Sequence, residues 1–514
     1  MAVESRSRTL LPLLLKAGAD LEKKMVDGRT ALWCALQLES EEDGVSSLLV
    51  AAGADPSASC SAQADSILHS LADQAREEAG LYLVSVGANV NQVNLRGESV
   101  LHLAATRGLA TLATALLVAG AEPNLQTGAE AGEVWRQSAL HLALSSAQET
   151  VVSCLLEFSQ PNDGLTTTLL DINLRNSRDE TPLALALSMG FTHLAEQMIQ
   201  NGADVNVTEA SGLSLLLQAV TTSNLSATSF LLQHGADITA RSPQGQTALE
   251  LAVAAGAEGV AEALCRAGAD TGSSSSGEPP LWLALEQGQE DMASILVRHG
   301  ADTDGWGPGP EGCEQTLLHR AVDERREEVA EFLVRAGCDL DSARRGGEED
   351  GQGPLHLATA WGQERVVTAL IEHGAGLGRG DREGKTALHL AIEGGSQGII
   401  NMLLGCPGID LSVRDKAGLS PFSCAMTYKN NSAARVILEL EPGAAEQPDA
   451  RGKNFLHTAI IKGDLESLLF LISISVNVHS KTTDSNKLAP ILLAVQVLAI
   501  YLQMCTRCPV PAGR

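Results

Sequence analysis

Aromatic residues are scarce in this sequence of 514 residues. Phe, Trp and Tyr together account for 3% of it, although the hydrophobic fraction is 44%. A core that is rich in hydrophobic residues but poor in aromatic ones is built from small and aliphatic side chains, which suits closely stacked helices. The composition therefore indicates a continuous packed core of helices.

Positive charge is also in short supply. Lys and Arg number 36 against 63 Asp and Glu, so the formal net charge is −27. Binding to a phosphate backbone needs clustered Lys and Arg, and no basic stripe with interleaved aromatics occurs here. Nucleic-acid binding is therefore not expected. The acidity is typical of a solvated surface, and it can also attract a basic face of a partner.

A disulfide framework is absent, although ten cysteines are present. Most lie inside helical patterns, as do Cys34, Cys154, Cys265 and Cys424. That is typical of reduced, buried thiols in a cytosolic protein, and residues 1–9 show no signal-peptide architecture. Cys505 and Cys508 have C-x-x-C spacing but lack two further ligands, so we expect no metal and no cofactor.

Only one hydrophobic segment is long. Residues 488–504 are apolar apart from Gln496 and Gln503, which is about enough for a short membrane span. Pro490 lies near its start and no basic cluster follows directly, so we favour a position outside the membrane. The chain is expected to be cytoplasmic.

A tripeptide close to Gly-Ala-Asp recurs along the chain. From Gly202 it appears again at Gly235, Gly268 and Gly300, in steps of 33, 33 and 32 residues. A second motif, Thr/Ser-x-Leu-His-Leu-Ala, keeps phase with it. Copies begin at Ser99, Ser138 and Thr386, and partial copies begin at Thr30, Ser66, Thr181 and Thr316.

The two motifs together resemble the ankyrin repeat, whose period is about 33 residues. The Thr or Ser hydroxyl is expected to cap a first helix by accepting a backbone N–H. The Gly of Gly-Ala-Asp is expected to end a second helix in the left-handed conformation. The predicted fold is all-α, an ankyrin-repeat solenoid of stacked helix-turn-helix units with β-hairpin fingers between them.

The repeat pattern predicts the domain organisation. We expect a partial repeat at 1–26, an array of about 13 repeats at 27–480, the start of a further repeat at 481–496, and a divergent tail at 497–514. Insertions lengthen loops near 125–137, 159–175, 303–313 and 342–352. Insertions of this kind often form binding elements, and disorder of these loops is an equal alternative.

Ten of the twelve histidines have a structural explanation. Seven occupy the motif position: His69, His102, His141, His319, His356, His389 and His457. Three more, His234, His299 and His373, directly precede a repeat-ending Gly. The motif histidine is expected to tie adjacent hairpins together by hydrogen bonds. Because no second ligand is in register, a catalytic or metal role is not expected.

Three tryptophans are candidates for partner binding, because aromatic residues are rare here and are enriched at interface hot spots. Trp306 lies in the insertion at 303–313, where a hairpin tip is expected, and Trp361 lies in the turn after a first helix. Trp282 aligns with the motif histidine and is expected to be packed. Trp306 and Trp361 are therefore the predicted partner-binding residues, with local packing as the alternative.

Three stretches outside the repeat consensus carry a closer resemblance. They are Gly305–Cys313 with the following Gln315–Ala321, Ser420–Asn431, and Asn454–His457 with Glu466–Ser473. Together they resemble the rabankyrin family of ankyrin-repeat and FYVE-domain proteins of early endosomes. That family combines an N-terminal BTB domain, a long ankyrin array and a C-terminal FYVE zinc finger for phosphatidylinositol 3-phosphate.

The resemblance covers only part of that layout. No BTB-like region precedes residues 10–17, and the ankyrin phase is lost after Gln496. We therefore expect a partial or alternatively spliced array, with fraying or self-association at its uncapped ends. Because the finger's C-x-x-C pairs and basic motif do not occur here, direct phosphoinositide binding is not expected.

The resemblance implies a non-enzymatic protein-interaction scaffold, peripheral at early endosomes, with an early-endosomal Rab GTPase and trafficking factors as partners. The alternative is an ankyrin adaptor in signalling or ubiquitin ligation. An enzyme is the third hypothesis, and it rests on Gly384-Lys385-Thr386. A phosphate loop needs four residues between its glycines, whereas Gly380 and Gly384 have three between them. We therefore expect no nucleotide site and no small-molecule substrate.

Overall fold

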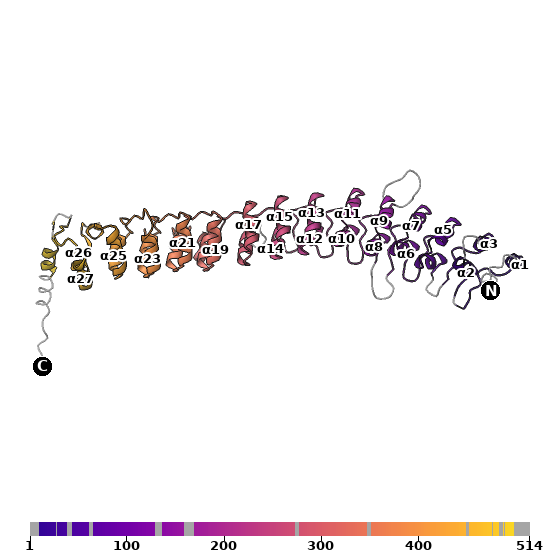
Figure 1. The fold of residues 1–514 in the computed structure, drawn as a ribbon, viewed down its shortest axis with the longest axis horizontal. Coiled ribbons are helices and arrows are strands. Elements are labelled where there is room, and N and C mark those ends of the chain that lie inside the picture. The colour runs from indigo at the N-terminus through magenta and orange to yellow at the C-terminus, as the bar shows by residue number, and fades with distance from the viewer. Residues whose placement is uncertain are drawn as a thin grey trace, which may run out of the picture. The chain divides into compact units, whose positions relative to one another are not determined.

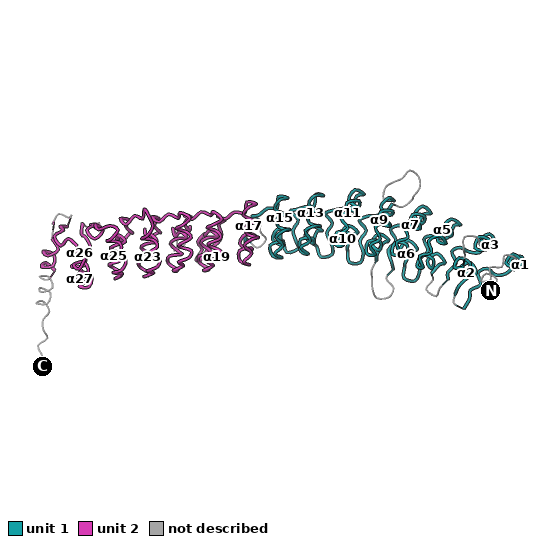
Figure 2. Tube along the Cα trace, in the orientation of Figure 1, with its two compact units in different colours: residues 1–278 teal, residues 279–514 magenta. Residues whose placement is uncertain are grey.

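The computed structural model describes residues 10–26, 28–38, 44–60, 65–128, 136–158, 169–272, 277–346, 351–448, 452–474, 476–482, 487 and 489–497. The chain divides into two compact units, Met1–Glu278 and Pro279–Arg514 (Figure 2). The predicted insertion at 159–168 and the tail beyond 497, with Cys505 and Cys508, lie outside the described residues.

Unit 1 is a stack of paired helices (Figure 1). Its first helices are α2 (Ala31–Leu38), α4 (Ile67–Asp73), α6 (Val100–Arg107), α8 (Ala139–Ser145), α10 (Pro182–Ser188), α12 (Leu215–Thr221) and α14 (Ala248–Ala254). Its second helices are α1 (Leu10–Lys16), α3 (Val45–Ala51), α5 (Glu77–Ser85), α7 (Ala110–Val118), α9 (Glu149–Glu157), α11 (Thr192–Gln200), α13 (Leu225–Gln233) and α15 (Glu258–Arg266). First helices contact first helices and second helices contact second helices, as α6 with α8 and α7 with α9.

Unit 2 repeats the same plan. Its first helices are α16 (Pro280–Glu286), α18 (Leu317–Asp323), α20 (Pro354–Ala360), α22 (Ala387–Gly394), α24 (Pro421–Thr427) and α26 (Phe455–Lys462). Its second helices are α17 (Glu290–Arg298), α19 (Glu327–Arg335), α21 (Glu364–Glu372), α23 (Gln397–Leu404), α25 (Asn431–Leu440) and α27 (Leu465–Ser473). Two short strands, β1 (Trp306–Pro308) and β2 (Glu314–Thr316), and two 3-10 turns, η1 (Pro310–Gly312) and η2 (Ala444–Glu446), complete it. The predicted ankyrin-repeat solenoid is confirmed.

The first helices begin as the motif predicts. The Oγ of Ser138 accepts a hydrogen bond from the backbone N–H of His141, and Pro182 stands at the first position of α10, where no N–H partner is needed. The Leu and Ala of the motif, such as Leu140 and Ala143, are buried. Because each helix pair buries these side chains against the next pair, the core continues from repeat to repeat.

The turn after α4, and after each later first helix that the structure describes, has one residue in the left-handed region, nine positions after the cap residue. Seven repeats place glycine there: Gly108, Gly190, Gly256, Gly288, Gly362, Gly395 and Gly463. Five place another residue: Ala75, Ala147, Ser223, Arg325 and Lys429, with φ between 54° and 57°. A side chain in this region is strained, at a cost of about 1 kcal/mol or more.

Short polar side chains link successive fingers, the loops that join one repeat to the next. The Oδ1 of Asn173 accepts the backbone N–H of Asp204 at 2.9 Å, and the Oδ1 of Asn206 accepts that of Asp237 at 2.8 Å. In unit 2 the Oδ1 of Asp304 accepts the N–H of Asp339 at 2.6 Å. These bonds fix the register of one finger on the next.

No helix among the described residues is long and apolar enough to cross a membrane. Residues 490–497 are helical, and Ile491, Leu492 and Val495 expose their side chains. On α27, Leu465 and Leu469 are also exposed.

Candidate protein-binding surface

Six of the seven motif histidines bond to the next finger, as predicted, and the seventh, His457, is seen bonded to its cap residue Asn454. In each of six repeats Nδ1 lies within hydrogen-bond distance of the cap residue, and Nε2 donates to a carbonyl of the next finger. The residues are His69, His102, His141, His319, His356 and His389, and their Nε2–O distances run from 3.0 to 3.2 Å. Burial lowers the pKa of each imidazole, because the charged form loses its hydration. These neutral rings are therefore occupied in holding repeats together.

Four consecutive repeats lack this histidine. Ala184, Leu217, Glu250 and Trp282 stand in its place. Glu250 makes the contact with the cap residue that the histidine makes elsewhere, since its Oε2 accepts the backbone N–H of Thr247 at 2.7 Å. Trp282 is fully buried, as predicted, with the guanidinium of Arg320 stacked 4.2 Å from its ring centroid. Its indole N–H has no hydrogen-bond partner among the described residues.

Trp306 begins a two-stranded hairpin in the insertion at 303–313. Strands β1 and β2 are antiparallel, with Trp306 opposite Thr316. The tip is closed by a hydrogen bond of 2.7 Å from the N–H of Gly309 to the carbonyl of Cys313, whose side chain is buried. The predicted hairpin finger is thus an ordered element, and it leaves Trp306 39% exposed.

The insertion at 342–352 packs against this hairpin. Glu314 and Arg345 exchange backbone hydrogen bonds of 2.9 and 3.1 Å, so the segment extends the sheet along β2. The side chain of Arg345 then lies over Trp306, with its guanidinium carbon 4.1 Å from the ring centroid. The two insertions therefore form one surface.

Arg344 points the other way, into the protein. Only 1% of this residue is exposed. Its Nη2 donates to the Oε1 of Gln315 at 2.6 Å and forms an ion pair with Asp323 at the end of α18. A buried guanidinium needs such partners, because desolvation of an unpaired charge is very costly.

Trp361 meets the same carboxylate from the next repeat. It directly follows α20, and its indole N–H donates to Asp323 Oδ1 at 3.4 Å. The guanidinium carbon of Arg325 lies 5.0 Å from its ring centroid, and 47% of Trp361 remains exposed. The structure thus connects the two predicted binding residues through Arg345, Arg344 and Asp323. We call Trp306, Asp323, Arg325, Arg344, Arg345 and Trp361 the tryptophan–arginine cluster.

Sequence reasoning did not single out Tyr428. This residue stands eight positions after its cap, as Trp361 does, and it is 45% exposed. Its hydroxyl donates to Glu393 Oε1 of the preceding repeat at 2.7 Å. Trp306, Trp361 and Tyr428 are the exposed aromatic side chains of the described part of the chain. Aligning the repeats by their cap residues would have found Tyr428.

The phosphate-loop hypothesis has no support from the geometry. Residues 381–384 form the finger turn, with the N–H of Gly384 bonded to the carbonyl of Asp381. Lys385 is held in ion pairs with Glu393 and Glu383 at 2.8 and 3.2 Å. Within the described ranges, no three His, Cys, Asp or Glu side chains come together as a metal site.

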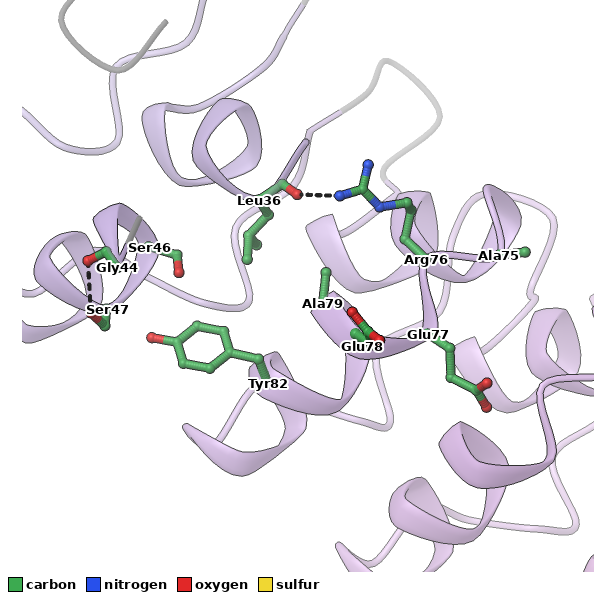
Figure 3. A pocket seen from close by; sticks show the side chains of 10 residues that line it. All are labelled: Leu36, Gly44, Ser46, Ser47, Ala75, Arg76, Glu77, Glu78, Ala79 and Tyr82. Atoms are coloured by element: carbon green, nitrogen blue, oxygen red, sulfur yellow. Dashed lines mark hydrogen bonds between the residues drawn. The ribbon is translucent and has the colours of Figure 1, made fainter. Parts of the chain in front are cut away.

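Unit 1 contains a cleft that could in principle hold a small ligand. It has a volume of about 650 Å³ and lies between α3 and α5, where Tyr82 and Ser47 line it (Figure 3). Arg76 donates to the carbonyl of Leu36 at 3.1 Å (Figure 3). It also donates to the carbonyl of Gln37 at 3.2 Å. Because its one guanidinium already has these partners, the cleft offers no cationic group for a ligand.

Comparison with known proteins agrees with the fold. The family of ankyrin repeats (3 copies) matches residues 101–209, 190–275, 268–344 and 341–415. Mouse Rabankyrin-5 is 43% identical over 526 residues, which is 93% of this chain and 45% of that protein. Human Rabankyrin-5 is 42% identical and covers 96% of this chain and 47% of that protein. The solved ankyrin repeat domain of Bcl-3 is 28% identical over 45% of this chain and 98% of its own, with a TM-score of 0.40.

The chain spans about half the length of the curated relatives that it matches. Its similarity to them extends along nearly all of its own length, well beyond the three stretches outside the repeat consensus that carried the resemblance. Repeats of this kind bind other proteins through their fingers and first helices. The chain belongs to the ankyrin-repeat family, and it is a rabankyrin-like protein-interaction scaffold.

Proposed function

We propose that this chain is a non-enzymatic scaffold at early endosomes, where it serves a Rab-dependent step of endocytosis and macropinocytosis. The observation that supports this proposal is the similarity to Rabankyrin-5 over 93% of the chain. The name of that protein points to Rab GTPases, and an early-endosomal Rab GTPase is therefore the first partner to test.

The partner-binding residues of the proposal are Trp306 and Trp361. Both are rare exposed aromatics, and both are held in place by arginines, so their rings are positioned before a partner arrives. Interface energy concentrates in a few such residues, because a rigid aromatic ring buries much area and loses little conformational entropy. Contacts of the partner with other fingers would add shape complementarity and specificity.

Proximity labelling in cells tests this proposal. The chain is fused to a labelling enzyme, and the parent is compared with Trp306→Ala/Trp361→Ala. A matched control is Met189→Ala, because Met189 is exposed and stands at the repeat position of Trp361 in unit 1. We expect endosomal Rab and coat neighbours for the parent and the control, and their loss in the double variant.

Two outcomes would contradict part of this proposal. Neighbours from signalling or ubiquitin-ligation complexes, without endosomal ones, would favour the ankyrin-adaptor alternative. Endosomal neighbours that persist in the double variant would keep the function and reject Trp306 and Trp361 as its anchors.

A further inference from the structure

Two arginines of the tryptophan–arginine cluster have no carboxylate partner among the residues that the structure describes. Arg325 and Arg345 are both exposed, and each lies on the face of an exposed tryptophan. The chain as a whole is strongly acidic, with a net charge of −27. Unmatched cations are unexpected on such a surface, where carboxylates are plentiful.

Two nearby carboxylates, those of Asp323 and Glu324, are engaged with other arginines. Asp323 pairs with buried Arg344 and also accepts the indole N–H of Trp361. Glu324 pairs with Arg320 and with Arg326, each at 2.9 Å. Asp323 and Glu324 are therefore paired with other arginines of the fold, and no ion pair to Arg325 or Arg345 is seen among the described residues.

Stacking on the tryptophans orients these two guanidinium groups. An arginine held over the face of an indole ring by a cation–π contact still has N–H groups that can donate to another molecule. Because stacking limits the rotamers of the side chain, less conformational entropy is lost when an acceptor binds. Trp306 and Trp361 thus act as supports for a pair of donors.

The backbone at Arg325 points to the same conclusion. Arg325 occupies the left-handed turn position, with φ of 56°, where seven other repeats have glycine. A residue with a side chain is strained there, so glycine would be the more stable choice. Four other repeats also place a non-glycine residue at this position, and in this repeat the side chain carries a cation to the ring of Trp361.

We propose that the tryptophan–arginine cluster binds an acidic peptide segment of a partner protein, with one carboxylate on Arg325 and another on Arg345. This inference deepens the proposed scaffold function and rests on it. Carboxylates match the planar fork of a guanidinium and accept two parallel hydrogen bonds from it. The partner's backbone and aliphatic groups pack on the exposed edges of Trp306 and Trp361.

Fluorescence anisotropy with synthetic peptides tests this assignment on the full chain. The probe is a labelled peptide of alternating Glu and Ser, about twelve residues long, which spans up to roughly 40 Å when extended. Reference peptides replace Glu by Gln, by Lys or by phosphoserine. The protein variants are Arg325→Gln/Arg345→Gln and the control Arg298→Gln, which removes another exposed arginine of unit 2 outside the cluster.

The Glu peptide should bind at least about tenfold more tightly than the Gln peptide, and more weakly as salt rises. The double variant should lose about tenfold in affinity for it, and Arg298→Gln less than about twofold. Arg325→Lys/Arg345→Lys should lie between, because lysine keeps the charge but not the planar fork. Circular dichroism confirms that each variant is folded.

Equal binding of the Glu and Gln peptides, or tighter binding of the Lys peptide, would overturn the inference. Binding of the phosphoserine peptide alone would overturn the assignment to carboxylates. This test and the proximity labelling can fail independently. If labelling of endosomal proteins depends on Trp306 and Trp361 but acidic peptides do not bind, the proposed binding of an acidic peptide is rejected and the scaffold function is kept.

Discussion

The buried guanidinium of Arg344 is paired with Asp323, 21 residues earlier in the chain and in the preceding repeat. Arg344 belongs to an inserted loop, whereas Asp323 ends a repeat helix. The ion pair therefore fixes the inserted loop, which most repeats lack, to a regular helix of the array. The exposed tryptophans depend on this link for their position.

Removal of the carboxylate at residue 323 should loosen unit 2. Asp323→Asn leaves the guanidinium of Arg344 buried without a counter-charge, which costs about 3 kcal/mol. In hydrogen exchange, amide protection should be lost first in β2 and in residues 343–346. Asp73→Asn is the matched control, since Asp73 holds the same repeat position and pairs with exposed Arg107. Its effect should stay below about 1 kcal/mol, and equal effects would contradict this account.

The motif histidines should make the array sensitive to acid. Their pKa values are lowered in the folded state, so the unfolded chain binds more protons below pH 6.5, and stability decreases as the pH is lowered. For His319 burial, helped by nearby Arg344, lowers the pKa to about 4. This shift is worth up to about 3 kcal/mol, lost between pH 6.5 and pH 4.

Thermal unfolding followed from pH 7 to pH 4.5 measures this dependence. His319→Gln should be less stable at pH 7 and should lose less stability on acidification than the parent. A parent profile that is flat over this range would refute the argument.

The left-handed turn position predicts a stabilising substitution. Ser223→Gly removes the strain of a side chain at φ 54° and should stabilise its repeat by about 0.5–1 kcal/mol. Gly190→Ala, at the same position in the preceding repeat, should destabilise by a similar amount, although the new methyl group meets no atom within 4 Å. Hydrogen exchange measures both effects, in α12 for Ser223→Gly and in α10 for Gly190→Ala. Amide protection should increase in the first variant and decrease in the second, and any other result would contradict the argument.

Truncation of two tryptophans should destabilise the protein to very different extents. Trp282→Ala creates a cavity beneath Arg320 and should cost about 3–5 kcal/mol. Trp361→Ala removes a half-exposed ring and should cost about 1 kcal/mol or less. Urea unfolding of unit 2 compares them. A large loss for Trp361→Ala would mean that the ring serves packing, which was the alternative to partner binding.

Much of the repeat architecture could be predicted from the sequence because its signals are local. The cap of Ser138, the bonds of His141 and the turn glycines depend on residues within one repeat or the next. The packing of Trp282 followed from its alignment with the histidine position.

The tryptophan–arginine cluster could not be predicted in the same way. Arg344 stands in a hydrophilic insertion beside Gly346 and Gly347, and such a pattern indicates an exposed loop. Its burial depends on Asp323 and Gln315, which no sequence spacing connects to it. Trp306 and Trp361 were singled out because they are rare, and their connection through arginines emerged only in three dimensions.

The absence of histidine from four consecutive motif positions divides the acid-sensitive bonds into two groups, one at His69, His102 and His141 and the other at His319, His356 and His389. The repeats from Thr181 to Leu285 use Ala, Leu, Glu and Trp at that position, so mild acid does not protonate an imidazole there. Since each repeat is stabilised by its neighbours, acid melting should proceed in order, from both histidine-bearing groups toward a middle that unfolds last.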